Sequence, residues 1–294
     1  MKPFDKRDFL RLLSSALVAA PTAALVSKST QPAGVQKITT YDRVIKSRLI
    51  RCGYDIWPPI ISKDINTDRL SGIFYDYMEA IGKNLDFKIE WINGITYANY
   101  FSELDYNRID AMCAGIWPIG TTITAVDFTD PLYYIAINAY TRAGDTRFDN
   151  DLSILNDSRY TIADIDGLVP ARIAAQDFPK AQTLSLPATS PASDMLLSVA
   201  DGKADITFTD AITAGDFSKN NLNKLRLVPR KMPIRVFGNT IAVGKNNEPF
   251  LRMLNNATQE LRDSGAIDRI LDQYEPYQNS FQRIIKPYNL KSAE

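Results

Sequence analysis

Hydrophobic residues follow two different spacings along this chain from about residue 48 onward. Short segments in which they alternate or run together predict strands, and longer segments in which they recur every three or four positions predict helices. In the first third we expect strands at residues 48–52, 87–92 and 109–113 and helices at residues 74–85 and about 97–104. Strands that alternate with helices predict a parallel sheet with helices packed on it.

The same alternation returns after residue 160. We expect strands at residues 160–163, 205–209, 225–228 and 240–244 and helices at residues 169–177, 193–200, 250–264 and 266–274. Asn247 and Pro249 before the long helix, and Gly265 after it, are typical start and stop signals. The polar residues 27–44 are expected to form a linker, and residues 275–294 have no assigned element.

Composition narrows the class of protein. The chain has 294 residues, of which 45% are hydrophobic and 23% charged, which suits a globular protein with room for two domains. Acidic and basic residues balance at 34 each, without the basic excess of a nucleic-acid-binding protein. The chain has no histidine and two cysteines, so we expect no histidine-dependent catalysis, no metal site and no cofactor.

The N-terminus has the pattern of an export signal. Four basic residues occur within the first eleven, and residues 12–26 are mildly apolar but too few to span a membrane. The segment KRDFLR at residues 6–11 is similar to a twin-arginine motif with Lys in the first place, and a plain Sec signal is the alternative. We therefore expect residues 1–26 to be a signal peptide and the protein to be exported and soluble in a periplasm.

Four motifs occur in a diagnostic order. NRID at residues 107–110 and DGKAD at residues 201–205 each precede a predicted strand, VDFTDPLY occupies residues 126–133, and TIAVG at residues 240–244 forms a later strand. Together they resemble the family 3 extracellular solute-binding proteins, the periplasmic amino-acid-binding receptors of ABC importers. The resemblance covers roughly residues 45–277.

The resemblance implies an α/β fold of the type II periplasmic-binding kind. Two lobes, each with its own sheet, would be joined by crossing strands near residues 136–141 and 236–243. Lobe 1 would comprise residues 45–139 plus 239–294, and lobe 2 residues 140–238. Ligand would bind between the lobes, at the carboxyl ends of the strands, and the lobes would close on it by hinge motion.

The implied function is that of a monomeric, non-enzymatic receptor. It would bind a small-molecule ligand and deliver it to the permease of an ABC importer, and would touch the membrane only through that complex. No nucleic-acid partner is expected. Two alternatives remain open, namely an enzyme on the same fold, similar to cyclohexadienyl dehydratases, and an interaction or sensory subunit whose cleft has lost its ligand.

Two departures from the family concern the ligand's carboxylate. Thr122 stands where the family has an Arg that grips the carboxylate by a bidentate pairing, and no Lys or Arg occurs from residue 109 to 141. The segment DIDGLVP at residues 164–170 replaces a hydroxyl-bearing loop, and its Asp164 adds negative charge. Arg172 is the nearby cation that could restore an anion site; alternatively it is a solvated helix charge. The resemblance therefore implies a ligand other than an ordinary α-amino acid.

Aromatic and small residues occupy the other positions that contact ligand in the family. Trp57 takes the place of an aromatic that packs on the ligand; alternatively it packs only on the prolines after it. Trp117 replaces a small hydroxyl residue and would form a second aromatic wall, a clamp with Trp57, or a plug that shrinks the cleft. Ala114 and Gly115 are small, which keeps their backbone accessible to ligand.

Asp210 aligns with the family's acid that holds the ligand's amino group. It also directly precedes a predicted helix, so helix capping is the alternative role. An acid that is retained while the Arg is lost predicts a ligand that is an amine or another organic cation.

Cys52 and Cys113 end strands that are neighbours in the family's sheet. An exported protein could oxidise them, but a disulfide between adjacent parallel strands has unfavourable geometry. We therefore expect two buried free thiols close to one another.

Overall fold

The computed structural model describes residues 38–120, 122–277 and 280–284. The signal peptide expected at residues 1–26 lies outside this part of the chain. Among the described residues, no helix has both the length and the apolar character needed to span a membrane.

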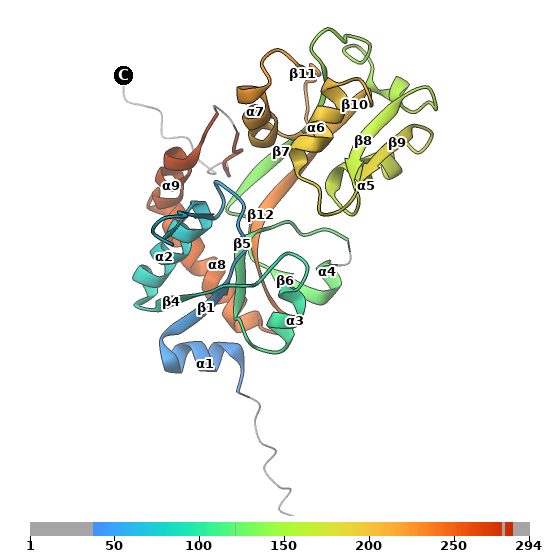
Figure 1. Ribbon diagram of the computed structural model, residues 1–294. Coiled ribbons are helices and arrows are strands. Elements are labelled where there is room, and N and C mark those ends of the chain that lie inside the picture. Colours follow the sequence, from blue (N-terminus) through green and yellow to red (C-terminus); the bar gives the residue numbers. More distant parts are fainter. Residues whose placement is uncertain (1–37, 121, 278–279, 285–294) are drawn as a thin grey trace, which may run out of the picture. The chain divides into compact units, whose positions relative to one another are not determined.

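Lobe 1 is a three-layer arrangement around parallel strands. Strand β1 (Leu49–Gly53) pairs in parallel with β4 (Lys88–Ile92) on one side and with β5 (Ala111–Ile116) on the other. Helix α2 (Ile73–Leu85) packs against β4 and β5, and it also contacts α8 and α9, so the C-terminal helices belong to this lobe (Figure 1). The lobe also contains α1 (Thr40–Ser47), β2 (Ser62–Lys63), β3 (Leu70–Ser71), α3 (Tyr100–Asp105), α4 (Thr122–Ala125), β6 (Val126–Phe128), α8 (Glu248–Asp263) and α9 (Ala266–Tyr274).

Lobe 2 repeats the parallel arrangement. Strand β8 (Thr161–Ile165) pairs in parallel with β9 (Gln182–Leu186) and with β10 (Ile206–Asp210). Helices α5 (Val169–Asp177) and α6 (Ala192–Ala200) pack against β8 and β10. The remaining elements are the 3₁₀ turn η2 (Leu152–Leu155), α7 (Ala211–Asn220) and β11 (Leu225–Leu227).

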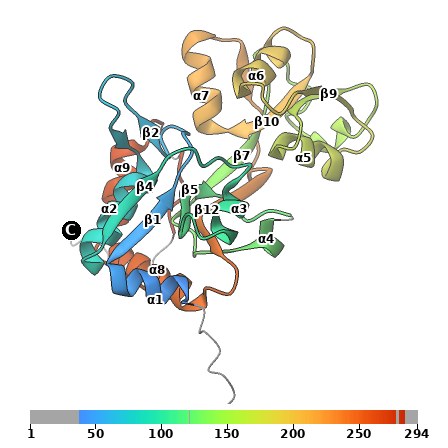
Figure 2. The ribbon, with the colours of Figure 1, turned by 60° about the horizontal axis from the view of Figure 1, so that its bottom comes forward.

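Two long antiparallel strands connect the lobes, as predicted. Strand β7 (Tyr133–Arg142) pairs with the first half of β12 (Arg235–Gly244), in a register that runs from Tyr133 opposite Asn239 to Ile137 opposite Arg235. The second half of β12 then pairs with β5 and β6, whereas the second half of β7 pairs with β10 and β11. Both strands are visible between the two groups of elements in Figures 1 and 2.

The expectation of two separate sheets is wrong. The hydrogen-bonded path is continuous in the order β4–β1–β5–β12–β7–β10–β8–β9. The reason is that the crossing strands pair with one another over five residue positions instead of merely passing between the lobes.

A carboxylate fixes the strand register at the same place in each lobe, and it is buried in lobe 1 and partly buried in lobe 2. Asp110, whose side chain is 1% exposed, accepts a hydrogen bond from Arg51 N at 2.7 Å, and its own N–H donates to Arg51 O at 2.8 Å. Asp205 accepts from Thr161 N at 2.9 Å and donates from its backbone to Thr161 O at 2.8 Å. These acids end the two similar turns, NRID and DGKAD, so one local motif joins neighbouring parallel strands in both lobes.

Part of the segment expected to be a linker is helical. Helix α1 starts with a capping box in which the Thr39 side chain accepts from Asp42 N and the Asp42 side chain accepts from Thr39 N. Val44 is fully buried, and Arg43 forms an ion pair with Asp110. The linker prediction is therefore wrong for residues 40–44. The polar composition of this segment predicts a linker, but the capping box starts a helix within it.

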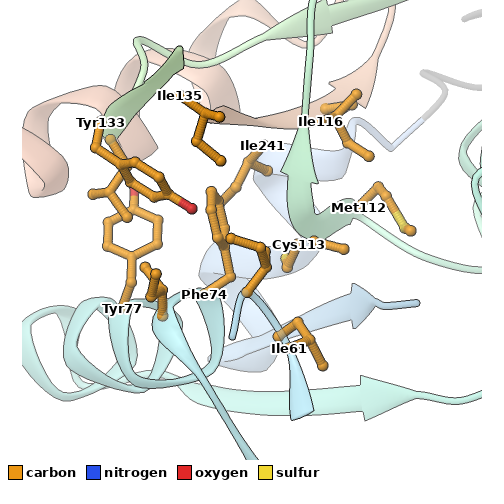
Figure 3. Packing of buried hydrophobic residues seen from close by; sticks show 14 of the residues in the cluster. Ile61, Phe74, Tyr77, Met112, Cys113, Ile116, Tyr133, Ile135 and Ile241 are labelled. Carbon is orange, nitrogen blue, oxygen red and sulfur yellow. The ribbon is translucent and has the colours of Figure 1, made fainter. Parts of the chain in front are cut away.

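The core of lobe 1 lies between its strands and α2. Figure 3 shows Phe74 and Tyr77, from α2, facing Cys113 of β5 and Tyr133 of β7. All four side chains are at most 1% exposed, and Tyr77 shares a hydrogen bond of 2.5 Å with the Thr258 hydroxyl of α8. This contact anchors α8 to α2.

Cys52 and Cys113 are both free and buried. Cys52 lies opposite Ala111 in the pairing of β1 with β5, which puts the two thiols on the same face of neighbouring strands. Burial is the main cause that raises the pKa of the Cys52 thiol, and the neighbouring Cys113 raises it further.

We expect two free thiols when the purified, exported form is unfolded without reductant and titrated with a thiol reagent. In the folded protein the same reagent should react slowly, because both sulfurs are buried and the thiolate is the reactive form. A titration that finds no free thiol in the unfolded monomer would contradict this prediction.

Asp110→Asn should lower the free energy of unfolding by about 3 kcal/mol, since it removes the buried partner of two partly buried arginines. Asp105→Asn is the matched control, because Asp105 is exposed at the end of α3 and should leave the midpoint of urea denaturation unchanged. Equal midpoints for the two variants would show that the Asp110 ion pairs contribute no stability.

Candidate functional site

A cavity of about 500 Å³ lies where the carboxyl ends of the strands in both lobes meet. Asp210 is the one charged residue among the described residues that line it, and most of the others are aromatic or aliphatic. The lining comprises Trp57, Tyr97, Tyr100, Phe101, Gly115, Ile116, Trp117, Ile119, Thr122, Ile137, Ile165, Gly167, Leu168, Val169, Pro170, Ala192, Met195, Phe208, Thr209, Asp210 and Thr213.

Trp57 is held at the cavity by the first turn of α2. The carbonyls of Pro59 and Ile60 accept hydrogen bonds of 3.0 Å from Ile73 N and Phe74 N, which are otherwise unsatisfied donors of the helix N-terminus. Gly72 permits this approach, because a Cβ there would lie 2.7 Å from the Ile60 carbonyl oxygen and its φ is +119°. The turn that carries Trp57 is therefore docked rigidly on α2.

Trp117 forms a continuous aromatic wall with its neighbours. Its ring meets the Trp57 ring edge-to-face at 5.6 Å between centroids and stacks on Phe237 at 4.8 Å. Its indole Nε1 donates to Asn239 Oδ1 at 3.0 Å. Because the two tryptophans contact each other, they do not form a clamp with a gap between them in this structure; they form one surface.

The two small residues of β5 have different surroundings. Gly115 lines the cavity with a φ of +72°, and a Cβ there would approach Ile60 Cγ2 to 2.9 Å. Ala114 is fully buried and is not part of the lining, and its carbonyl accepts a hydrogen bond of 2.7 Å from the Tyr97 hydroxyl. The Ala114 carbonyl therefore serves to hold Tyr97 at the cavity.

Thr122 lines the cavity at the start of α4. Its hydroxyl donates to Ile119 O at 2.6 Å and accepts from Ile119 N at 3.1 Å, so it is occupied in a local turn. Arg172 lines an adjacent hollow of about 230 Å³, and its guanidinium lies against Gly120. Arg172 is not among the residues of the main cavity.

Asp164 does not line the cavity, contrary to expectation. Successive residues of a strand face opposite sides, and here Ile165 faces the cavity and packs in one cluster with Met195 of α6. Asp164 is 1% exposed, its Oδ1 has no hydrogen-bond partner among the described residues, and burial raises its pKa.

Asp210 is the N-cap of α7, which is the alternative role predicted from its position before a helix. Its Oδ1 accepts from Ile212 N and Thr213 N, both at 2.9 Å, and its Oδ2 accepts from the Thr213 hydroxyl at 2.8 Å. It is 7% exposed and lines the cavity. An ionised carboxylate has about four acceptor positions, so Oδ2 keeps one that can receive a further donor.

Several aromatic residues of the site were not predicted from the sequence. Tyr97, Tyr100 and Phe101 were assigned only to the apolar face of a helix, but α3 begins at Tyr100, and all three line the cavity. Burial raises the pKa of Tyr100 to about 12, so its phenol is neutral at ordinary pH. Phe208 of β10 also lines the cavity, and alternation in the segment ITFTD was the available signal.

No arrangement of three or more His, Cys, Asp or Glu side chains within the described ranges could hold a metal ion. The cavity can thus surround an apolar body with aromatic and aliphatic groups and present one carboxylate to it.

Known proteins similar to this chain share its fold. An ancestral amino acid-binding protein, a precursor of cyclohexadienyl dehydratase, superposes with a TM-score of 0.65 at 21% identity over 80% of this chain and 99% of its own. A putative binding component of an ABC transporter from Wolinella succinogenes, complexed with lysine, gives 0.65 at 17% identity over 78% and 97%. A probable histidine-binding protein of Neisseria gonorrhoeae is 23% identical over 207 residues, 70% of this chain and 75% of that protein.

The sequence pattern of one family covers most of the chain. It matches residues 50–277, which run from the second residue of β1 to beyond the end of α9. The chain belongs to the bacterial extracellular solute-binding proteins, family 3.

Proposed function

We propose that this protein is a periplasmic receptor that delivers a small organic amine or cation with an apolar body to the permease of an ABC importer. The observation that carries the proposal is Asp210, the one charged side chain among the described residues that line a mainly apolar cavity. Family membership supports the transport role, because solute-binding proteins of this class supply ABC transporters.

The charge of the site favours a cation. A carboxylate with little exposure stabilises an opposite charge more strongly than one in bulk water, because the effective dielectric is lower. The aromatic wall of Trp57 and Trp117 adds faces with which a cation interacts favourably, by about 0.5–2 kcal/mol. Among the described residues that line the main cavity, none is cationic and could hold a carboxylate.

Similar proteins support a positively charged ligand in part. One structural relative is complexed with lysine, and another, from Streptococcus pneumoniae, is bound to L-arginine. Those ligands also carry an α-carboxylate. In this chain Thr122 uses its hydroxyl in a local turn, so the present site favours the amine without the carboxylate.

An enzymatic function is the second candidate, because one structural relative is a precursor of cyclohexadienyl dehydratase. General acid–base catalysis requires a titratable group within reach of the substrate. Asp210 is the one acid among the described residues that line the cavity, and helix capping already uses three of its acceptor positions, so no second carboxyl group is in place to share acid–base catalysis. Binding without turnover is therefore the function that we propose.

Calorimetry with four compounds that share one phenyl group tests the ligand class. We expect 2-phenylethylamine to bind more tightly than 2-phenylethanol, phenylalanine or 3-phenylpropionate, because only the amine presents a positive charge without a carboxylate. Mass spectrometry of the recovered amine should show no conversion. Tightest binding of phenylalanine or 3-phenylpropionate would contradict the cation proposal, and conversion of a bound compound would favour an enzyme.

Asp210→Asn should weaken binding of 2-phenylethylamine by about 2 kcal/mol or more, since it removes the charge of a desolvated contact. Asn is as good an N-cap as Asp, so the start of α7 should persist. Asp194→Asn is the control, because Asp194 is exposed on α6 near the cavity but does not line it.

Unchanged affinity in Asp210→Asn, or an equal loss in Asp194→Asn, would show that Asp210 does not bind the amine. Trp57→Ala should also weaken binding, and Trp57→Phe should restore part of the loss because it keeps an aromatic face.

A further inference from the structure

The chain that follows α9 contacts the other lobe and one of the crossing strands. Helix α9 ends at Tyr274 on lobe 1, and the described residues after it are 275–277 and 280–284. No helix or strand is predicted for them from the sequence. We call the described residues 275–277 and 280–284 the C-terminal strap.

Tyr277 docks on α7 of lobe 2. Its hydroxyl donates to Asp216 Oδ1 at 3.0 Å, and Lys219 Nζ lies 5.2 Å from the centre of its ring. The ring covers Gly215 so closely that a Cβ there would lie 2.4 Å from Tyr277 Cε2. A glycine within a helix costs stability, and here it permits this close contact between a tyrosine attached to lobe 1 and a helix of lobe 2.

The next part of the strap docks on β7. Gln282 and Tyr134 exchange two backbone hydrogen bonds of 2.8 Å in an antiparallel bridge. Phe281 is 3% exposed, and its ring contacts the Tyr133 ring edge-to-face at 4.8 Å between centroids. These contacts lie at the start of the crossing strand, on the side of lobe 1.

An ion pair also attaches the strap to α9. Arg283 Nη2 forms ion pairs with Asp272 at 2.7 Å and with Glu275 at 2.9 Å. Glu275 also accepts from Phe281 N at 3.2 Å. The strap is thus fastened to lobe 1 on both sides of Tyr277, so that Tyr277 is its contact with α7.

We propose that the C-terminal strap is a third connection between the lobes and that it restricts how far the cleft opens. Tyr277, which is attached to lobe 1, makes this connection by packing on Gly215 and donating a hydrogen bond to Asp216 of α7. The crossing strands β7 and β12 are the other two connections. Hinge motion concentrates its backbone rotation in a few residues at element ends. A side chain anchored on one lobe and packed on a helix of the other limits that rotation, with or without ligand.

Interlobe distances in the ligand-free protein test this role independently of the proposed ligand. Spin labels at Lys83→Cys on α2 and Lys180→Cys on lobe 2 occupy exposed positions, whereas both native thiols are buried. Pulsed electron paramagnetic resonance should give one narrow distance distribution for the otherwise unchanged protein. Tyr277→Ala should add a population at longer distance, and Tyr277→Phe, which keeps the ring, should add less.

Two further variants make the result specific. Gly215→Ala should also add the longer distance, although alanine favours a helix more than glycine does, because its methyl group would collide with the Tyr277 ring. Tyr106→Ala is the matched control, since Tyr106 is 65% exposed on lobe 1 and should leave the distribution unchanged.

A distribution in Tyr277→Ala that coincides with that of the unchanged protein would overturn the proposal, as would an equal change in Tyr106→Ala. If Tyr277→Ala does not fold, Gly215→Ala decides: a distribution identical to that of the unchanged protein overturns the proposal. Because these distances are measured in the ligand-free protein, a result that overturns the role of the strap would not contradict the proposed transport function.

Discussion

The pairing of the parallel strands in both lobes depends on two carboxylates at the starts of β5 and β10, of which Asp110 is buried and Asp205 is partly buried. Asp110 and Asp205 each bind both backbone groups of a residue in the neighbouring parallel strand, Arg51 and Thr161 respectively. A charge removed from water is costly unless it is paired and hydrogen-bonded, so these contacts specify one strand register in each lobe. The register in turn determines where the strands end, and the cavity is built at those ends.

The cavity combines this rigid frame with backbone positions that only glycine can occupy. Gly72 allows the turn that carries Trp57 to satisfy the N-terminus of α2, and Gly115 brings β5 close to Ile60. The aromatic wall of Trp57 and Trp117 is therefore attached to the core of lobe 1 and not to a free loop. Asp210, capping α7, brings a charge from lobe 2 to the same space.

The connections between the lobes differ in kind. Strands β7 and β12 are hydrogen-bonded to each other, which makes the path between the lobes a twisted ladder and not a pair of independent linkers. The C-terminal strap joins the lobes through side chains, chiefly Tyr277 on α7. Side-chain contacts of this kind can break and re-form without loss of the sheet, so they suit the adjustment of a hinge.

The sequence by itself predicted most of the longer helices, the family and the crossing strands. Periodicity and capping signals are local, so α5 (Val169–Asp177) and α9 (Ala266–Tyr274) were predicted with their observed bounds. Only the tertiary structure decided which side chains meet. It turned Asp164 into the core and Ile165 toward the cavity, joined Trp57 to Trp117, and recruited Tyr97 and Phe208. The physical reason is that the facing of a strand residue, and the partner of a ring, depend on packing between segments far apart in the chain, which local periodicity does not encode.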